Sequence, residues 1–435
     1  MNQLKLLWST LRESFWFIPA LIVAFSMVLA LGMIEVDTSG SWEWIDDWPR
    51  IFGANAEGAR GMLATIAGSM MTVVGVTFSM TLVTLALASS QYTSRILRNF
   101  MSDHATQIVL GIFTGTFTYC LLVLRSIRKG DEGGFVPSLS VAFSVVLAIC
   151  SIGTLIFFFH HIAASIQASS ILASVTKETL EAVDRLFPEK PDLEPKEIEA
   201  VLPEQRWQFV LATRNGYLQG VNDKALLRLA GEHKTVVRME RGIGEFVVEN
   251  TPLASVSLGE EPNDEMLSGI RSAFSIDRYR TVHQDCAFGI RQLVDMALHA
   301  LSPGINDTTT AVMCVDYLTA ILARLAPRQL PSSRLYEDGQ LRVITIQQSF
   351  ASLVADAFDE IRGSAEGNVT VLLKLLDALE ILGSLTEQPG RKEVLREHLE
   401  SIAELAERSI TAPRDRERFE KRIARVREAF PRSGD

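Results

Sequence analysis

One short segment carries an arginine, an aspartate and a histidine at a spacing that could support catalysis. Arg291, Asp295 and His299 follow one another at intervals of four residues, so a helix would place them on one face. A base, an acid and an imidazole in line could form an enzyme site, but the same row is typical of a ladder of ion pairs. We favour the ladder and expect no enzyme, with this row as the place where an enzyme would act.

The segment SPGINDT (residues 302–308) follows directly after this row. Its Pro-Gly pair ends one helix, and Asn306 or Asp307 caps the next. Free backbone amides at such a helix start can hold an anion. Asn306, Asp307 and Thr308 therefore form a candidate ligand or anion site, and a well-capped helix turn is the alternative.

Other chemical signatures are missing from the sequence. The chain holds no Walker loop, no dinucleotide fingerprint and no G-x-S-x-G elbow. Its 7 histidines are scattered without the spacing of zinc ligands. We therefore expect neither a cofactor nor a metal. The net charge of −10 argues against nucleic acid as a partner.

The elements that would position these residues fall into two parts. The chain has 435 residues, of which 47% are hydrophobic, and its mean hydropathy is +0.18. The apolar excess lies in residues 1–165, and most of the charged residues follow it. The composition excludes a disordered chain, a disulfide scaffold and a purely soluble enzyme. It predicts a mainly α membrane protein with a soluble second part, so the lipid bilayer is one partner.

Four apolar runs are long enough to cross a bilayer as helices, at residues 15–34, 62–88, 108–124 and 139–159. Together they predict a four-helix transmembrane domain at residues 1–165. Basic residues such as Lys5 and Arg98 favour cytoplasmic termini, whereas Arg125 and Lys129 oppose them. Sparse, unpaired cysteines suit a reducing compartment. We therefore expect a multi-pass protein of the cytoplasmic (inner) membrane with both termini in the cytoplasm.

The second span carries a face of small residues that only Leu82 interrupts. One stripe of this face consists of Gly61, Gly68 and Gly75, and the neighbouring stripe consists of Thr65, Thr72, Ser79 and Ala86. We assign Gly61, Gly68, Gly75 and Ala86 to helix packing, and Thr65, Thr72 and Ser79 are the candidate pore-lining residues. Two interpretations remain open. The span is either a tightly packed central helix, whose hydroxyls bond to their own carbonyls, or the lining of a pore shared by several subunits.

The loop before this span is acidic, with Asp46 and Asp47 at its centre. In a pore of several subunits, these carboxylates would form a ring at the outer mouth. Such a ring concentrates cations, so the pore would favour them.

The soluble part divides into three segments. Residues 166–206 are predicted to be a helical extension and a Pro-rich linker, with an uninterrupted helix over 163–186. Residues 207–260 are predicted to be a small β domain, in which Asn215-Gly216 indicates a hairpin. The glycine turn and Pro-Leu strand that follow resemble half of the biotinyl/lipoyl barrel-sandwich fold. Residues 261–435 are predicted to be a C-terminal domain that is helical to its end.

Four segments together resemble one known family, the predicted membrane proteins called domain of unknown function 2254. They are TIAGSMMTVVGVTFSMTLVTLALASSQYTSRILRNF, FTYCLLVLRSIR, HHIAASIQAS and FGIRQLVDMALHALSPGINDTTTA. Thr308 stands where the family commonly has a proline, which leaves the helix start intact. The resemblance implies the architecture and carries no established activity.

The leading hypothesis is a homo-oligomeric, cation-favouring channel of the cytoplasmic membrane, gated or filtered by its cytoplasmic domain. Four spans are few for a transport path through one subunit, and a small-residue face needs a partner helix. The partners expected are therefore further copies of the chain, lipid and ions. The main alternative is a non-conducting scaffold or regulator whose cytoplasmic domain binds a protein or a small ligand.

Overall fold

The computed structural model describes residues 16–39, 55–91, 103–128, 135–165, 167–188, 207–257 and 264–430. The chain divides into two compact units, an N-terminal unit of residues 1–170 and a C-terminal unit of residues 171–435. The described part is mainly helical, with small sheets between the first helices and the last ones. The predicted fold class is confirmed at this level.

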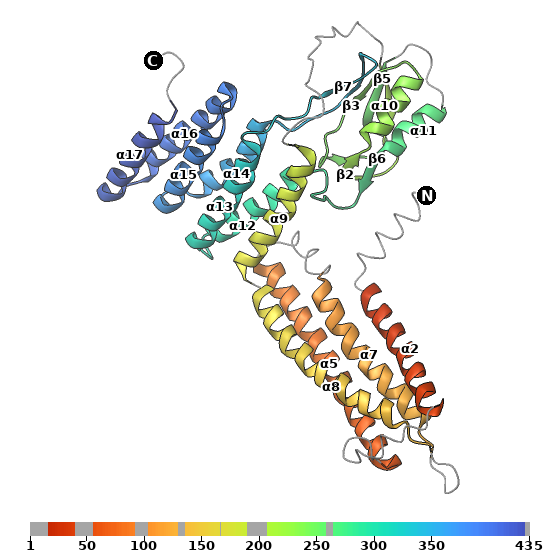
Figure 1. Ribbon diagram of the computed structural model, residues 1–435. Helices are drawn as coiled ribbons and strands as arrows, with labels where there is room; N and C mark the ends of the chain where they lie inside the picture. Colours follow the sequence, from red (N-terminus) through yellow and green to blue (C-terminus); the bar gives the residue numbers. More distant parts are fainter. Residues whose placement is uncertain are drawn as a thin grey trace. The chain divides into compact units, whose positions relative to one another are not determined.

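The N-terminal unit contains four long helices that lie side by side (Figure 1). They are α2 (Phe17–Ser39), α5 (Ala56–Gln91), α7 (His104–Ser126) and α8 (Ser138–Ser165). Each is long and apolar enough to cross a membrane, and each coincides with one of the four predicted runs to within a few residues at either end. With 36 residues, α5 is about 54 Å long, well beyond the ~30 Å of a bilayer core.

The central helix of this bundle is α7, which contacts α2, α5 and α8. A Cβ on Gly111 would lie 3.2 Å from the Pro19 Cα and would clash with the Ile22 side chain of α2. Gly115 faces Ser26 of the same helix at similarly close range. These two glycines let the backbones of α2 and α7 approach closely. The interpretation that made the second span the central helix is therefore wrong, because α7 takes that place.

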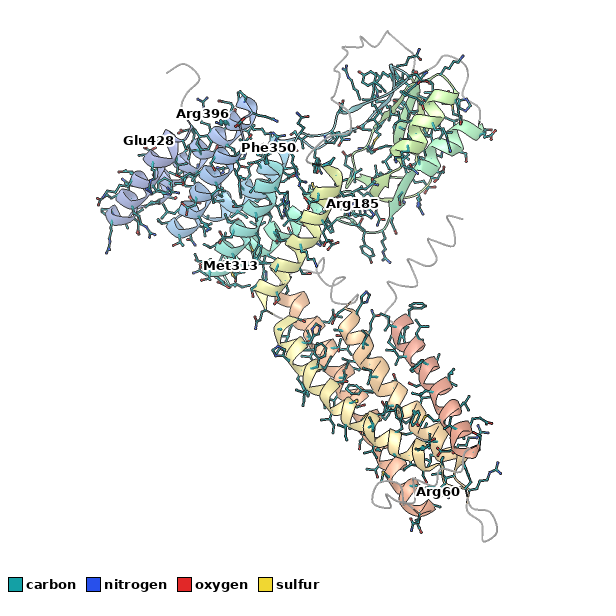
Figure 2. All side chains as sticks on the ribbon, viewed as in Figure 1. Arg60, Arg185, Met313, Phe350, Arg396 and Glu428 are labelled. Atoms are coloured by element: carbon teal, nitrogen blue, oxygen red, sulfur yellow. The ribbon has the colours of Figure 1, made fainter. Side chains whose placement is uncertain are left out.

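Charged side chains fasten the ends of the bundle. Asp37 accepts hydrogen bonds from the Leu139 and Ser140 amides at 3.0 and 2.9 Å, so it caps the start of α8. Arg60, which lies at one end of the bundle (Figure 2), donates to the Ile127 carbonyl just after α7. Asp103 caps α7, and its carboxylate lies 2.8 Å from the His161 Nε2 of α8. The contacts of Asp37, Arg60 and Asp103 with backbone groups satisfy donors and acceptors that a helix end leaves unpaired, and the His161 contact adds a link between two side chains.

The predicted continuous helix over 163–186 is wrong. Helix α8 ends at Ser165, and α9 (Ala168–Leu186) begins after a bend at Gln167. There the Gln167 amide bonds to the Ala164 carbonyl at 3.3 Å, three residues back, in place of the helical four-residue spacing. Neither glycine nor proline marks this bend in the sequence.

The C-terminal unit holds two sheets that share one hydrophobic core with helices α10 (Asp223–Glu232) and α11 (Asp264–Ala273). The strands of the five-stranded sheet are, in spatial order, β1 (Trp207–Leu211), β5 (Pro252–Ser257), β3 (Val237–Met239), β8 (Gln340–Ile344) and β7 (Arg334–Glu337). Those of the three-stranded sheet are β4 (Phe246–Val247), β2 (Gly216–Val221) and β6 (Phe274–Asp277). The chain alternates between the two sheets from β1 to β6.

The predicted hairpin at Asn215-Gly216 is wrong, although both of its strands exist. Strand β1 pairs with β5, and β2 pairs with β4 and β6. Gly216 has a φ of +155°, and a Cβ there would lie 2.6 Å from the Asp277 carbonyl oxygen. The Asn215 side chain accepts the Glu249 amide at 2.8 Å. The segment therefore serves as a crossing between sheets instead of a two-residue turn.

The expectation of helix alone after residue 265 is also wrong, because β6, β7 and β8 lie there. Strands β7 and β8 form a hairpin that joins the first sheet through parallel pairing of β8 with β3 (Figure 1). Asp338 and Gly339 turn this hairpin with φ values of 51° and 74°, as a type I′ turn requires. The β part thus extends past residue 260, where the sequence placed its end.

Six helices complete the C-terminal unit. They are α12 (Cys286–Leu301), α13 (Thr308–Leu325), α14 (Phe350–Ser364), α15 (Val369–Leu385), α16 (Pro389–Ser409) and α17 (Pro413–Glu428). Helices α13 and α14 both pack against α12. Helix α13 contacts α15, and α14 contacts α15 and α16. Both α15 and α16 contact α17, which is the last helix. By length and composition, α13 is a fifth helix that could cross a membrane, so the predicted count of four spans is not confirmed.

We predict that Gly111→Leu destabilises the helix bundle by about 1–3 kcal/mol or more, because the new side chain has no room against α2. Unfolding of the purified protein in detergent micelles measures this. Gly153→Leu on α8 is the matched control, since nothing lies within 4 Å of a Cβ there. Equal stability of the two variants would contradict the close approach of α2 and α7.

Candidate functional site

Helix α5 has two different faces. Its buried face contains Leu63, Met70, Thr77 and Thr84, which recur every seven residues. This face belongs to the clusters that α5 forms with α7 and α8. The opposite face carries the small residues that the sequence analysis singled out, all of them exposed in the single chain: Gly61, Thr65, Gly68, Thr72, Gly75, Ser79 and Ala86. We call these seven residues the small face of α5.

The glycines of the small face have no close neighbour among the residues that the structure describes. A Cβ on Gly61, Gly68 or Gly75 would meet nothing within 4 Å. This differs from Gly111 and Gly115, whose missing Cβ atoms admit a neighbouring helix. The helix-packing role predicted for the small face is therefore not filled by the described residues of one chain. It stays a prediction about another copy.

The threonines of the small face bond back to their own helix. The Thr65 hydroxyl donates to the Gly61 carbonyl at 2.8 Å, and the Thr72 hydroxyl donates to the Gly68 carbonyl at 3.1 Å. Each hydroxyl oxygen keeps acceptor lone pairs that point outward with the side chain. Leu82, seven residues after Gly75 on the same stripe, is a bulky side chain that is 51% exposed. The mouth residues Asp46 and Asp47 lie outside the described residues.

The segment at 302–308 forms a capped helix turn. Asp307 accepts the Thr310 amide at 3.0 Å and the Thr310 hydroxyl at 2.6 Å. These hydrogen bonds hold the pKa of Asp307 below its usual value. Thr308 accepts the Asn368 side-chain amide at 2.9 Å, and Asn306 turns the chain with a φ of 49°. The carboxylate of Asp307 thus takes an amide that an anion would need, which favours the capping interpretation.

Arg291 and Asp295 form an ion-pair ladder from α12 to α14. The Arg291 Nε donates to Asp295 at 2.7 Å, and its other nitrogens bind Glu360. Hydrogen bonding from Arg291 lowers the pKa of Glu360. The His299 Nε2 is buried without a hydrogen bond to the described residues, so it does not extend the ladder. An open hollow on α13 is lined by Ala320, Ala323, Arg324, Pro327 and Arg328, and by none of this row.

The residues that fix α9 onto the rest of the C-terminal unit were not predicted from the sequence. Gly289 of α12 faces Thr179 of α9 with no room for a Cβ between them. Arg328 donates to the Phe187 carbonyl at 2.7 Å, and its other nitrogen bonds Asp184 at 2.6 Å. This arginine caps the end of α9. A glycine in the middle of the apolar run of α12 was the available signal.

No group of three or more metal-ligating side chains occurs among the described residues. The described chain joins several apolar helices of spanning length to a unit of small sheets and helices. These features define a helical membrane protein.

Comparison with known proteins gives the family. Residues 12–381 match the family described as predicted membrane protein, domain of unknown function 2254, and the chain belongs to that family. It is 32% identical over 447 residues to uncharacterized proteins of Mycobacterium tuberculosis and Mycobacterium bovis. These alignments cover 100% of this chain and 84% of each relative. No solved structure matches the chain significantly.

We predict that Asp307→Ala lowers the free energy of unfolding by about 1 kcal/mol at neutral pH, because α13 loses its cap. Since the folded-state pKa of Asp307 is depressed, the charge-dependent part of this contribution is present above the unfolded pKa of about 3.9. It is lost as the pH falls through the folded-state pKa. Thermal unfolding against pH measures both effects.

Asp307→Asn is the control for this prediction, because asparagine also caps a helix but carries no charge. The Asp307→Asn variant should keep most of the stability that the cap provides. It should lose only the part of this stability that depends on the Asp307 charge and therefore on pH. Stabilisation of the wild type by phosphate, with a larger stabilisation of Asp307→Asn because the competing negative charge is gone, would contradict the capping interpretation and favour an anion site.

Proposed function

We propose that the protein is a homo-oligomeric channel or pore of the cytoplasmic membrane, with α5 facing the axis of the assembly. The observation that supports this is the small face of α5, which points away from the helices of its own chain. The C-terminal unit lies in the cytoplasm under this proposal and gates or filters access. Both termini are then cytoplasmic.

Packing physics favours a second copy over lipid as the neighbour of the small face. Glycine, serine and threonine give lipid tails few contacts, but they let another helix approach closely. Helix α7 already has three neighbours in its own bundle, whereas the small face of α5 meets none of the described helices. A ring of copies would pack the glycine stripe of each α5 against the next copy. The threonine stripe, beside it on the helix, would then turn toward the axis.

The proposed path is lined by oxygen atoms and narrowed at one level. Thr65, Thr72 and Ser79 supply hydroxyl oxygens at three successive levels, and Leu82 supplies the apolar constriction. Asp46 and Asp47 form the acidic ring at the outer mouth, which favours cations.

We propose that four helices cross the membrane and that α13 does not. The described part of α13 packs against α12 and α15, and Asp316 in its middle pairs with Lys374 of α15. A charged residue in mid-helix is costly in lipid. The ion pair to α15 suits a helix in a water-soluble core.

The second candidate is a non-conducting membrane scaffold or regulator that uses the same interface. The back-bonded hydroxyls of Thr65 and Thr72 favour this reading, because they need no water. The enzyme alternative at Arg291, Asp295 and His299 stays third.

Ion flux across liposomes that contain the purified protein tests the channel. We predict flux in the wild type and its loss in Thr72→Leu, because a leucine at this level fills the path without touching the helices of its own chain. Met71→Leu is the control, since Met71 is 53% exposed one position along the helix and off the small face. It should conduct as the wild type does.

Absence of wild-type flux at every salt, pH and voltage tried would contradict the channel and favour the scaffold. Loss of flux in both variants would place the path elsewhere than along α5.

A further inference from the structure

The last helix, α17, carries a stripe of basic side chains on its exposed face. Arg414, Arg418, Lys421 and Arg425 are all exposed and lie three or four residues apart. At 100° per residue they fall within roughly 60° of arc and extend over about 16 Å. The apolar residues of the helix, Phe419, Ile423 and Val426, are buried on the opposite side. We call these four exposed residues the basic stripe.

Three arginines of the stripe form no ion pair with the described residues. Other basic residues of α17 are engaged: Arg422 binds Asp377 and Glu380, Arg427 binds Glu400, and Arg416 donates to the Ile410 carbonyl. Glu428, which marks the end of this helix in Figure 2, lies beside the stripe. Lys421 pairs with Glu417. For Arg414, Arg418 and Arg425, no ion pair links the guanidinium to another described residue.

The charge of the stripe is unusual for this protein. The whole chain has a net charge of −10, and the guanidinium groups of Arg422 and Arg427 on the same helix each bind carboxylates. The three guanidinium groups lie in line, and no carboxylate of the described residues is bound to them. They repel one another, so contact with an external anionic surface would lower their electrostatic free energy. No large apolar side chain of α17 is exposed, so such contact involves headgroups without insertion into the bilayer.

We propose that the basic stripe of α17 docks on anionic lipid headgroups. The reason for lipid as the partner is that the same chain carries helices of membrane-spanning length, so a bilayer surface is present wherever the protein is. The tether raises the effective concentration of that surface and offsets the weakness of a contact made by few charges. Each arginine or lysine near an anionic membrane contributes binding free energy, and four such residues together contribute enough for measurable binding. The inference does not depend on whether the protein conducts ions.

The test uses the full-length protein in nanodiscs of phosphatidylcholine, a lipid without net charge. These nanodiscs are mixed with free vesicles of phosphatidylcholine alone or with phosphatidylglycerol added, and co-flotation is measured. The wild type should bind the phosphatidylglycerol vesicles, and added salt should weaken the binding. The triple variant Arg414→Gln/Arg418→Gln/Arg425→Gln should bind on the order of 100-fold more weakly.

The matched control removes the same number of charges elsewhere in the C-terminal unit. Arg214→Gln/Lys224→Gln/Arg228→Gln changes three exposed basic residues of the β part, and it should bind as the wild type does. All six positions are exposed and all six substitutions are to glutamine, so thermal unfolding should show that both variants fold.

Three results would overturn the proposal. In the first, the triple variant binds the vesicles as tightly as the wild type does. In the second, the wild type binds vesicles equally well with and without phosphatidylglycerol. In the third, the wild type does not bind the vesicles at low salt. Wild-type protein that ignores the vesicles but binds polyglutamate through the stripe would assign this surface to an acidic protein instead.

Discussion

The close approach of α2 to α7 at Gly111 and Gly115 is the contact on which the N-terminal unit depends. It seats α7 at the centre of the bundle, where α5 and α8 also contact it. Charged and polar groups at Asp37, Arg60 and Asp103 then close the helix ends. Because α7 occupies the centre, α5 packs on the described helices through one face, and its small face has no partner among the described residues. The proposal of an assembly follows from this arrangement more than from the small residues themselves.

The C-terminal unit depends on pairing between segments that lie far apart in the chain. Strand β8 lies parallel to β3, more than a hundred residues earlier, and so joins the β part to the insertion between α13 and α14. Helix α9 packs on α12 at Gly289 and is capped by Arg328 from the segment after α13. These contacts make residues 171–435 one compact unit, despite the mixture of sheets and helices.

Local patterns predicted most elements, and long-range pairing accounts for most of the failures. The apolar runs gave four helices, and Asn222 and Asp307 cap α10 and α13 by ordinary side-chain geometry. The Asn-Gly pair at 215–216 led to a wrong hairpin prediction, because the chain crosses between the two sheets there. Asp338-Gly339, which was not predicted, forms a true hairpin turn. The bend at Gln167 has no local signal at all. For the candidate site, spacing identified the small face of α5, but only the structure shows that this face points away from its own bundle.

The central claim is that the small face of α5 meets another copy of the chain, and disulfide cross-linking tests it most directly. In a variant without native cysteines, Gly68→Cys and Gly153→Cys each place one thiol at a position with nothing within 4 Å in the single chain. A disulfide requires Cα atoms within about 7 Å. Oxidation in native membranes should link copies through residue 68 on α5 and leave residue 153 on α8 unlinked. Failure of residue 68 to link, or equal linking at both positions, would contradict the account.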